Sequence, residues 1–337
     1  MLKPAKVLVV APQWVGDSLF FLPAVDALRR RFPQAGFTLL AKAAIAALHK
    51  DSGRFEAVAA LPPGAGRLDR FRAHWRLRDQ GFDLAVVFPD SFSSALAAFL
   101  SGVKVRVGRR GQGRAWLLSP GYRLPPRLRQ DHVVDEYLAL ALACGAPLDP
   151  AARSPKLAPP AAGVEERARL FRENGLGAGL LVGLCPTSAY GPAKEWPAGH
   201  WVELARRLVE RRFSVAFFCA PNELERVGSL ATAAGGLPLL APGLPGLAAC
   251  LQACEVVVAN DSGPLHLAAA VGARAVGLYG PVSPRWSAPL SARAESIYLG
   301  LECSPCHAKV CPLGHHRCLQ DLSVDRVLET FDQVLKR

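Results

Sequence analysis

The sequence predicts an α/β protein made of two doubly wound, Rossmann-like domains, each a parallel β-sheet with helices on both faces. Short apolar, β-branched runs alternate with segments of helical periodicity, which is typical of parallel strands buried under helices. The length of 337 residues fits two domains of ordinary size. A segment rich in Pro and Ala, 149–163, has no periodicity and interrupts the alternation, so it is the predicted linker.

The first half contains three short apolar runs that predict buried strands, at Lys6–Ala11, Phe37–Ala41 and Leu84–Phe88. Between the first two, apolar residues at helical spacing predict one helix over Ser18–Phe32. We expect these elements to form a first domain, residues 1–155.

The second half repeats this alternation, and we expect a second domain over residues 164–322. Its last segment, 323–337, predicts an amphipathic helix with a cap-like Ser, which we expect to pack back on the first domain. The predicted strands are Leu180–Cys185, Ser214–Cys219, Val256–Asn260 and Ala275–Tyr279, and the predicted helices are His200–Arg212, Pro264–Val271 and Ser323–Lys336.

Positive charge is concentrated in the first half. The chain has a formal net charge of +12, and residues 1–160 hold 23 Lys and Arg against 12 Asp and Glu, while residues 161–337 hold 17 against 16. A solvated charged face is the simplest explanation, but an anionic acceptor or an anionic membrane surface explains one-sided charge equally well. Nucleic acid is disfavoured, because neither a nucleic-acid-binding motif nor a platform of aromatic residues is present. The basic residues concerned are Lys104, Arg106, Arg109, Arg110, Arg114, Arg123, Arg127 and Arg129.

The N-terminal apolar run is short and is interrupted by Pro12, Gln13 and Gly16, which favours a first strand over a signal peptide. No apolar run approaches the roughly 18–20 residues that a membrane span needs. Nine cysteines are too few for a disulfide framework in a chain of this length. We therefore expect a cytoplasmic protein with reduced or metal-bound cysteines.

The first candidate motif, Pro-Gln-Trp-Val-Gly-Asp-Ser at 12–18, directly follows the first predicted strand. In an open α/β sheet this turn faces the ligand crevice, and Gly16 permits close backbone approach. Asp17 lies at the start of a helix. It is either a carboxylate stabilised by the helix dipole or a general base.

Two loops of the second half suit a phosphate group. The loop 185–197 offers the hydroxyls of Thr187 and Ser188 and the charge of Lys194, although it lacks the spacing of a Walker A loop. The segment 260–266 places Gly263 and Pro264 in a first helical turn, whose backbone N–H groups stabilise a diphosphate. An ordinary loop, a helix cap at Asp261 and Ser262, and a buried structural His266 are the alternatives. Because both loops should open at one sheet edge, we favour a diphosphate site.

Four cysteines lie within 16 residues, with histidines between them, at the density of a zinc or iron–sulfur site. The spacings after the first pair are not those of a standard finger, so a cluster of reduced or disulfide-bonded cysteines is the alternative. If a metal binds, we expect a structural role. The residues are Cys303, Cys306, Cys311 and Cys318.

These motifs together resemble the lipopolysaccharide heptosyltransferases of glycosyltransferase family 9. The resemblance extends in order over nearly the whole chain. It rests on PQWVGDS, FPDSFSSALAAFLSGVKVRVGRRGQGR, DHVVDEYLAL, PTSAYGPAKEWP and NDSGPLHLAAAVGARAVGLYGPVSP.

The resemblance implies a two-domain GT-B fold, with a first domain that binds the acceptor and a second that binds the nucleotide sugar. It implies inverting transfer of L-glycero-D-manno-heptose from ADP-heptose to the inner core of lipopolysaccharide, without a required cofactor. It also implies a monomer at the inner face of the cytoplasmic membrane. The sequence has no Asp-x-Asp motif for a divalent ion, so Lys194 and a helix N-terminus would neutralise the leaving group.

The residues that the resemblance implies fall into three groups. Asp17 and Lys194 would be catalytic, with Asp17 as the general base. The donor would contact Thr187, Ser188, Lys194, Glu223, Asp261, Ser262, Gly263 and His266. The acceptor would contact Trp14, Gly16, Ser91, Ser94, Arg109 and Arg114.

Two other functions compete with this one. A GT-B transferase that uses another nucleotide sugar, or a related epimerase, would share the fold and the phosphate loops. A non-catalytic protein that binds nucleic acid or a membrane surface through the basic half would leave the phosphate loops without a role.

Overall fold

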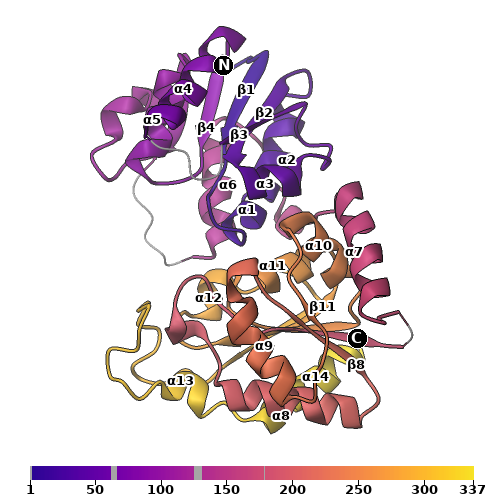
Figure 1. Ribbon diagram of the computed structural model, residues 1–337. Coiled ribbons are helices and arrows are strands. Elements are labelled where there is room, and N and C mark those ends of the chain that lie inside the picture. Colours follow the sequence, from indigo (N-terminus) through magenta and orange to yellow (C-terminus); the bar gives the residue numbers. More distant parts are fainter. Residues whose placement is uncertain (1, 62–66, 125–130, 178) are drawn as a thin grey trace. The chain divides into compact units, whose positions relative to one another are not determined.

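A computed structural model describes residues 2–61, 67–124, 131–177 and 179–337, so Arg127 and Arg129 lie outside the described residues. The chain divides into two compact units, Met1–Pro155 and Lys156–Arg337, each built on a six-stranded parallel sheet (Figure 1). The strand orders are β3-β2-β1-β4-β5-β6 and β12-β11-β10-β7-β8-β9. The predicted α/β class with two doubly wound sheets is confirmed. No helix in the described ranges is long and apolar enough to cross a membrane.

In the first unit, helices α4 and α5 cover one face of the sheet, where Ala97 and Ala98 of α5 pack on Leu8 and Val87. Helices α1, α2 and α6 pack together on the other face. The strands are β1 (Lys6–Val10), β2 (Gly36–Lys42), β3 (Ala57–Leu61), β4 (Leu84–Val87), β5 (Val105–Arg109) and β6 (Arg123–Leu124). The α-helices are α1 (Asp17–Phe20), α2 (Leu22–Arg31), α3 (Ala43–His49), α4 (Arg67–Arg76), α5 (Phe92–Leu100) and α6 (Val133–Ala143).

The segment predicted as one helix over 18–32 is divided at Phe21 into α1 and α2. Pro23 lies in the first turn of α2 and has no N–H to donate to the preceding turn. The division leaves α1 as a single short turn that begins at Asp17, directly after the loop that follows β1.

In the second unit, β7 lies between β8 and β10, so the loops after these three strands leave the same edge of the sheet. The strands are β7 (Leu181–Cys185), β8 (Ser214–Phe218), β9 (Leu239–Leu240), β10 (Val256–Asn260), β11 (Arg274–Tyr279) and β12 (Ala294–Tyr298). The α-helices are α7 (Ala161–Glu173), α8 (Ala198–Glu210), α9 (Leu224–Ala233), α10 (Leu244–Gln252), α11 (Gly263–Ala270), α12 (Pro284–Ser287), α13 (Arg317–Gln320) and α14 (Val324–Leu335).

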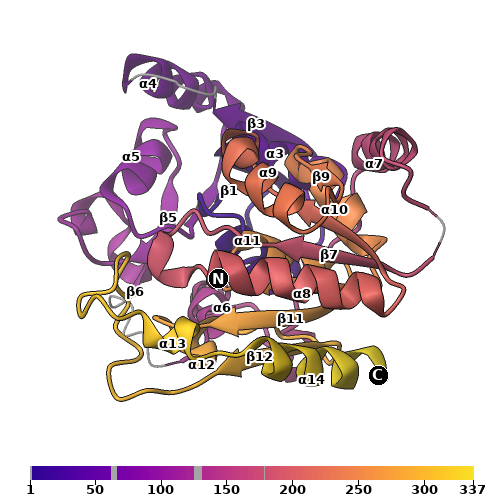
Figure 2. The ribbon, with the colours of Figure 1, turned by 60° about the horizontal axis from the view of Figure 1, so that its bottom comes forward.

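The terminal helix α14 begins after Ser323, whose side chain caps it as predicted by accepting a hydrogen bond from the Arg326 N–H. Its apolar face, with Val327 and Phe331, belongs to the core of the second unit and packs beside α8, β11 and β12 (Figure 2). Contact of this helix with the first domain stays a prediction. The apolar side of α14 is buried against other elements of the second unit.

Candidate functional site

In the first unit, Asp17 is the first residue of α1, so its carboxylate lies at the positive end of a helical turn. The Tyr137 hydroxyl of α6 donates a hydrogen bond to Asp17 Oδ1 at 2.8 Å. Asp17 is half-buried, and Trp14 in the same loop is 56% exposed. A partly accessible, oriented carboxylate beside an exposed indole is suited to act as a base on a bound hydroxyl group.

Tyr137 is a site residue that we did not single out from the sequence. Its ring is buried and lies edge-on against Phe88 at 5.6 Å, and Phe88 in turn lies edge-on against Phe21 at 5.2 Å. This aromatic stack fixes the ring while the hydroxyl reaches Asp17. The helical pattern of DHVVDEYLAL was the only available signal, and it predicts a core tyrosine.

The structure corrects the expectation that Arg109 and Arg114 lie on an exposed basic surface, because both are buried. Arg114 Nε donates to the Arg109 carbonyl at 2.9 Å, and its guanidinium also donates to Ser91 O at 3.0 Å. Arg109 donates to the Glu136 carbonyl at 2.8 Å and pairs with the Glu136 carboxylate at 3.5 Å. Their donors therefore organise the protein interior.

Ser91 and Ser94 belong to the same network at the N-terminus of α5. The Ser91 hydroxyl caps the helix by accepting from the Ser94 N–H, while the buried Ser94 hydroxyl donates to Ser91 O and accepts from Arg114 at 3.1 Å. These side chains hold the loop after β4 in place. Contact of Ser91, Ser94, Arg109 or Arg114 with an acceptor stays a prediction.

In the second unit, Lys194 Nζ lies 2.5 Å from Asp261 Oδ2, and His266 Nε2 lies 3.5 Å from Asp261 Oδ1. All three side chains are largely buried, and the Lys194 ammonium also lies over the Tyr190 ring at 4.6 Å. Burial by itself would raise the pKa of Asp261, but His266 and Lys194 together hold that pKa below its ordinary value. The structure thus brings together three residues that were predicted to bind the sugar donor, one from the loop after β7 and two from the segment after β10, where Asp261 precedes α11 and His266 lies on it.

Asn260, at the end of β10, explains how these two loops meet. Its Oδ1 accepts from the Trp196 N–H at 3.0 Å, and its Nδ2 donates to Pro186 O at 2.7 Å. The fully buried amide therefore holds both ends of the loop 186–196 beside the loop that carries Asp261. We did not single out Asn260 from the sequence, because Asn is common in the turns that follow strands.

Ser262 occupies the N-cap position of α11 but makes no side-chain capping bond, contrary to the helix-cap alternative. Its buried hydroxyl has no hydrogen-bond partner within the part of the chain that is described. The first N–H groups of a helix have no intrahelical acceptors, and Pro264 removes one donor from this turn. The start of α11 therefore offers backbone and hydroxyl donors that suit a phosphate oxygen.

Glu223, which follows β8, also reaches the loop after β7. Its Oε2 accepts a hydrogen bond from the Thr187 hydroxyl at 2.8 Å and another from the Ala220 N–H at 3.1 Å. Ser188 N–H donates to Glu195 Oε1 at 3.0 Å. Residues predicted for the donor thus come from the ends of β7, β8 and β10, which are neighbouring strands.

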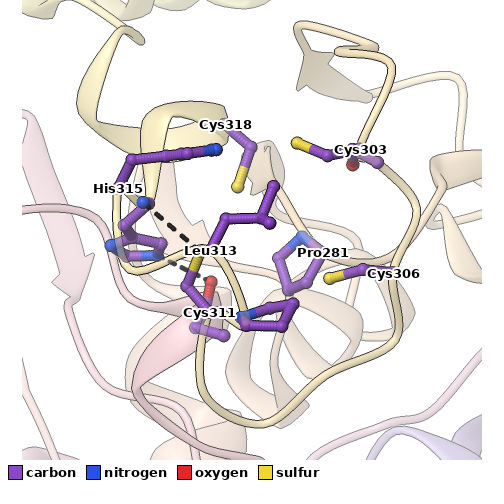
Figure 3. Close-up of a pocket in the computed structure, with 11 residues that line it drawn as sticks. Pro281, Cys303, Cys306, Cys311, Leu313, His315 and Cys318 are labelled. Carbon is purple, nitrogen blue, oxygen red and sulfur yellow. Dashed lines mark hydrogen bonds between the residues drawn. The ribbon is translucent and has the colours of Figure 1, made fainter.

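The four clustered cysteines line one pocket with Pro281, Leu313 and His315 (Figure 3). His316 also lines this pocket, and none of the four cysteines forms a disulfide. The N–H of His316, followed by other backbone donors, lowers the pKa of Cys311, whereas burial and the neighbouring thiols raise the pKa of Cys318 to about 11. Across the described ranges, however, no three His, Cys, Asp or Glu side chains are placed to hold a metal ion. The structure therefore does not support the zinc or iron–sulfur alternative for Cys303, Cys306, Cys311 and Cys318.

The cysteine-rich segment instead supports the loop that carries Lys194. Ala193 N–H donates to Lys309 O at 3.0 Å, and His316 Nε2 lies 2.8 Å from Ala193 O. Gly191 has a φ of +149°, and a Cβ at this position would lie 2.6 Å from Lys309 O. Only glycine allows this close approach of the two segments.

The chain is similar to known proteins over nearly its whole length. Residues 70–317 match the model of the family described as glycosyltransferase family 9 (heptosyltransferase). The chain is 31% identical to lipopolysaccharide heptosyltransferase 2 of Escherichia coli K12, over 98% of both chains. It is 30% identical to lipooligosaccharide heptosyltransferase 2 of Haemophilus ducreyi, over 98% of this chain and 99% of the relative. The solved structure of E. coli ADP-heptose LPS heptosyltransferase II superposes with a TM-score of 0.82 at 29% identity, over 98% of both chains.

Proposed function

Because the chain belongs to glycosyltransferase family 9, the heptosyltransferases, and is therefore a glycosyltransferase, we propose that it transfers L-glycero-D-manno-heptose from ADP-heptose to the Kdo- and heptose-containing inner core of lipopolysaccharide. The observation that carries this proposal is the cluster of Lys194, Asp261 and His266 beside the start of α11. Full-length similarity to heptosyltransferase 2 relatives supports the choice of sugar and acceptor.

The donor half of the reaction follows from charge. When the bond between the anomeric carbon and the diphosphate breaks, negative charge develops on the leaving ADP. Lys194 and the N–H groups of the first turn of α11 would stabilise that charge, and Thr187, Ser188, Ser262, Gly263 and His266 would position the diphosphate and the heptose. Asp261 holds Lys194 in place and would accept from the sugar hydroxyls, while Glu223 would lie near the adenosine ribose. This assignment needs no metal or cofactor.

The acceptor half depends on Asp17. We infer that its carboxylate takes the proton of the acceptor hydroxyl as that oxygen bonds to the anomeric carbon, which inverts the configuration in a single displacement. Trp14 and Gly16 would contact the acceptor directly. The backbone around this region would be held in place by Ser91, Ser94, Arg109 and Arg114, since their hydrogen bonds are made within the protein.

The proposed acceptor is a lipid-anchored, anionic glycolipid, so we propose that the protein acts at the inner face of the cytoplasmic membrane. We also propose that it acts as a monomer. The excess of positive charge in the first 160 residues favours an anionic acceptor on that unit. We propose no nucleic-acid partner.

The decisive experiment incubates the protein with ADP-heptose and a Kdo-containing core acceptor, and mass spectrometry then measures the addition of one heptose. A parallel panel of ADP- and UDP-sugars tests the rival donors. Transfer from a UDP-sugar, or epimerisation without transfer, would contradict the proposal.

Asp17→Asn tests the base in the same assay. The amide keeps the size of the side chain but cannot accept the proton, so we expect turnover to fall by about 10²–10⁴-fold while calorimetry finds ADP-heptose binding nearly unchanged. Retained turnover would remove Asp17 from the role of base.

A further inference from the structure

Three aromatic side chains form an exposed stripe on the first unit, on the face of the sheet that α4 and α5 cover. Phe92 and Phe99 lie seven residues apart on α5 and therefore on one side of that helix. The Trp116 ring lies between them, 6.3 Å from Phe92 and 6.0 Å from Phe99. Phe92 is 39% exposed, Phe99 42% and Trp116 61%. We define Phe92, Phe99 and Trp116 as the aromatic stripe.

Cationic side chains border this stripe. The Arg106 guanidinium lies over the Phe99 ring at 5.4 Å and donates to Leu117 O, next to Trp116. Arg123 donates to Leu118 O at 3.2 Å, and Lys104, whose side chain is 82% exposed, precedes the same strand as Arg106. Lys104 has an acidic neighbour in Asp83, whose Oδ1 lies 4.0 Å from the Lys104 Nζ.

Exposed aromatic rings bordered by cationic side chains favour a lipid surface over a protein as the partner of the stripe. Tryptophan and phenylalanine rings insert at the level of the lipid headgroups, and adjacent lysines and arginines attract anionic headgroups. The donor and acceptor sites use none of the three rings. The stripe also lies on the face opposite α6, which carries Tyr137, so a docked lipid surface would leave the support of Asp17 untouched.

We propose that the aromatic stripe, with Lys104, Arg106 and Arg123 at its border, docks the protein on an anionic lipid bilayer. The proposal deepens and rests on the proposed function, because a lipid-anchored acceptor requires an enzyme that reaches the bilayer surface. It assigns that contact to Phe92 and Phe99 of α5 and to Trp116 of the turn 115–117, three side chains that the proposed function gives no role in binding either substrate.

Vesicle co-sedimentation of the full chain tests the surface. We expect binding to vesicles of phosphatidylglycerol and phosphatidylethanolamine, and at least tenfold weaker binding to phosphatidylcholine vesicles. The double variant Phe99→Ser/Trp116→Ser should bind the anionic vesicles at least tenfold more weakly than wild type. Lys104→Glu should weaken binding about fivefold or more, with a smaller salt dependence.

Leu142→Ser is the matched control, because Leu142 is an exposed apolar residue, at 56%, on α6. It should bind vesicles as wild type does. Equal binding by wild type and the double variant would overturn the proposal, as would absence of wild-type binding to anionic vesicles. A wild-type dimer that the double variant dissociates, without vesicle binding, would assign the stripe to a second copy of the chain and also overturn it.

Activity on two acceptors separates this proposal from the proposed function. With a deacylated, water-soluble core acceptor, the double variant should turn over as wild type does, whereas with the acceptor embedded in vesicles it should be several-fold slower. Loss of vesicle binding with full activity on the soluble acceptor supports both proposals. If the wild type bound vesicles but was inactive on both acceptors, the result would contradict the proposed function and would still support the docking surface.

Discussion

Asp17 is oriented by the phenol of Tyr137, which makes that hydrogen bond the clearest target at the scale of single residues. Tyr137→Phe keeps the ring that packs on Phe88 and removes only the hydroxyl. We expect kcat to fall about tenfold, less than for Asp17→Asn, because the carboxylate remains but samples more orientations. Steady-state kinetics should show the KM for ADP-heptose unchanged. A change in this KM with kcat intact would mean that Tyr137 acts through the fold.

His49 links the same region to pH. It is fully buried, 3.4 Å from the Ser18 hydroxyl, and burial lowers its pKa from 6.5 to about 3. Between these two values the unfolded chain binds a proton that the folded chain does not. Stability is therefore complete above pH 6.5 and falls as the pH decreases towards 3. From pH 7 to pH 5 the loss is about 2 kcal/mol from this residue.

Urea denaturation of the full chain at both pH values measures this loss. His49→Gln does not titrate, so its free energy of unfolding should change by about 2 kcal/mol less than that of wild type between pH 7 and pH 5. Identical pH dependence in the two proteins would contradict the lowered pKa, because it would mean that His49 binds protons equally in the folded and unfolded chains.

Some candidate residues could be proposed from the sequence and others could not. Asp17, Lys194, Asp261 and His266 are candidates because each belongs to a segment that follows a predicted strand. Arg109 and Arg114 were predicted to lie on the surface, because charged side chains are buried only when a network satisfies them. That network includes Glu136 and the carbonyl of Ser91, which lie far from these arginines in the sequence.

At the scale of elements, the central strands were predictable and several edge strands were not. β1, β4, β7 and β10 are buried on both faces and read as continuous apolar runs. β3 and β12 lie at sheet edges, where half-exposed side chains remove that signal. The predicted helix over 18–32 is divided before Pro23, which has no N–H to donate to the preceding turn; the sequence prediction took no account of this proline. The amphipathic pattern of α14 predicted a buried face, and that face lies in the core of the second unit.

The contact between the cysteine-rich segment and the Lys194 loop leads to a prediction for these two elements. Gly191→Ala would force a Cβ against Lys309 O and a disfavoured backbone conformation. We expect the loop to shift and the Kd for ADP to rise about tenfold, measured by calorimetry. Gly199→Ala in α8 is the matched control, because a Cβ there meets no atom within 4 Å. Equal ADP affinity in both variants would show that the segment does not support the loop.

At the scale of the whole molecule, the two units have the same pattern of strand order but different electrostatics. Each places its candidate residues after neighbouring central strands, at the edge where doubly wound sheets bind ligands. The first 160 residues carry most of the excess positive charge, while the rest of the chain is nearly balanced. This division suits a polyanionic acceptor on one unit and a donor held by a few short-range contacts on the other.

The division of charge predicts different salt dependences for the two substrates. Exposed positive charge attracts an anionic acceptor over a distance that salt shortens, whereas the buried pair of Lys194 and Asp261 is screened much less. Between 50 and 300 mM NaCl we expect the KM for the core acceptor to rise about fivefold and the KM for ADP-heptose to change less than twofold. Both constants come from the same initial-rate series, so each is the control for the other. Equal slopes would mean that the basic half of the chain does not attract the acceptor.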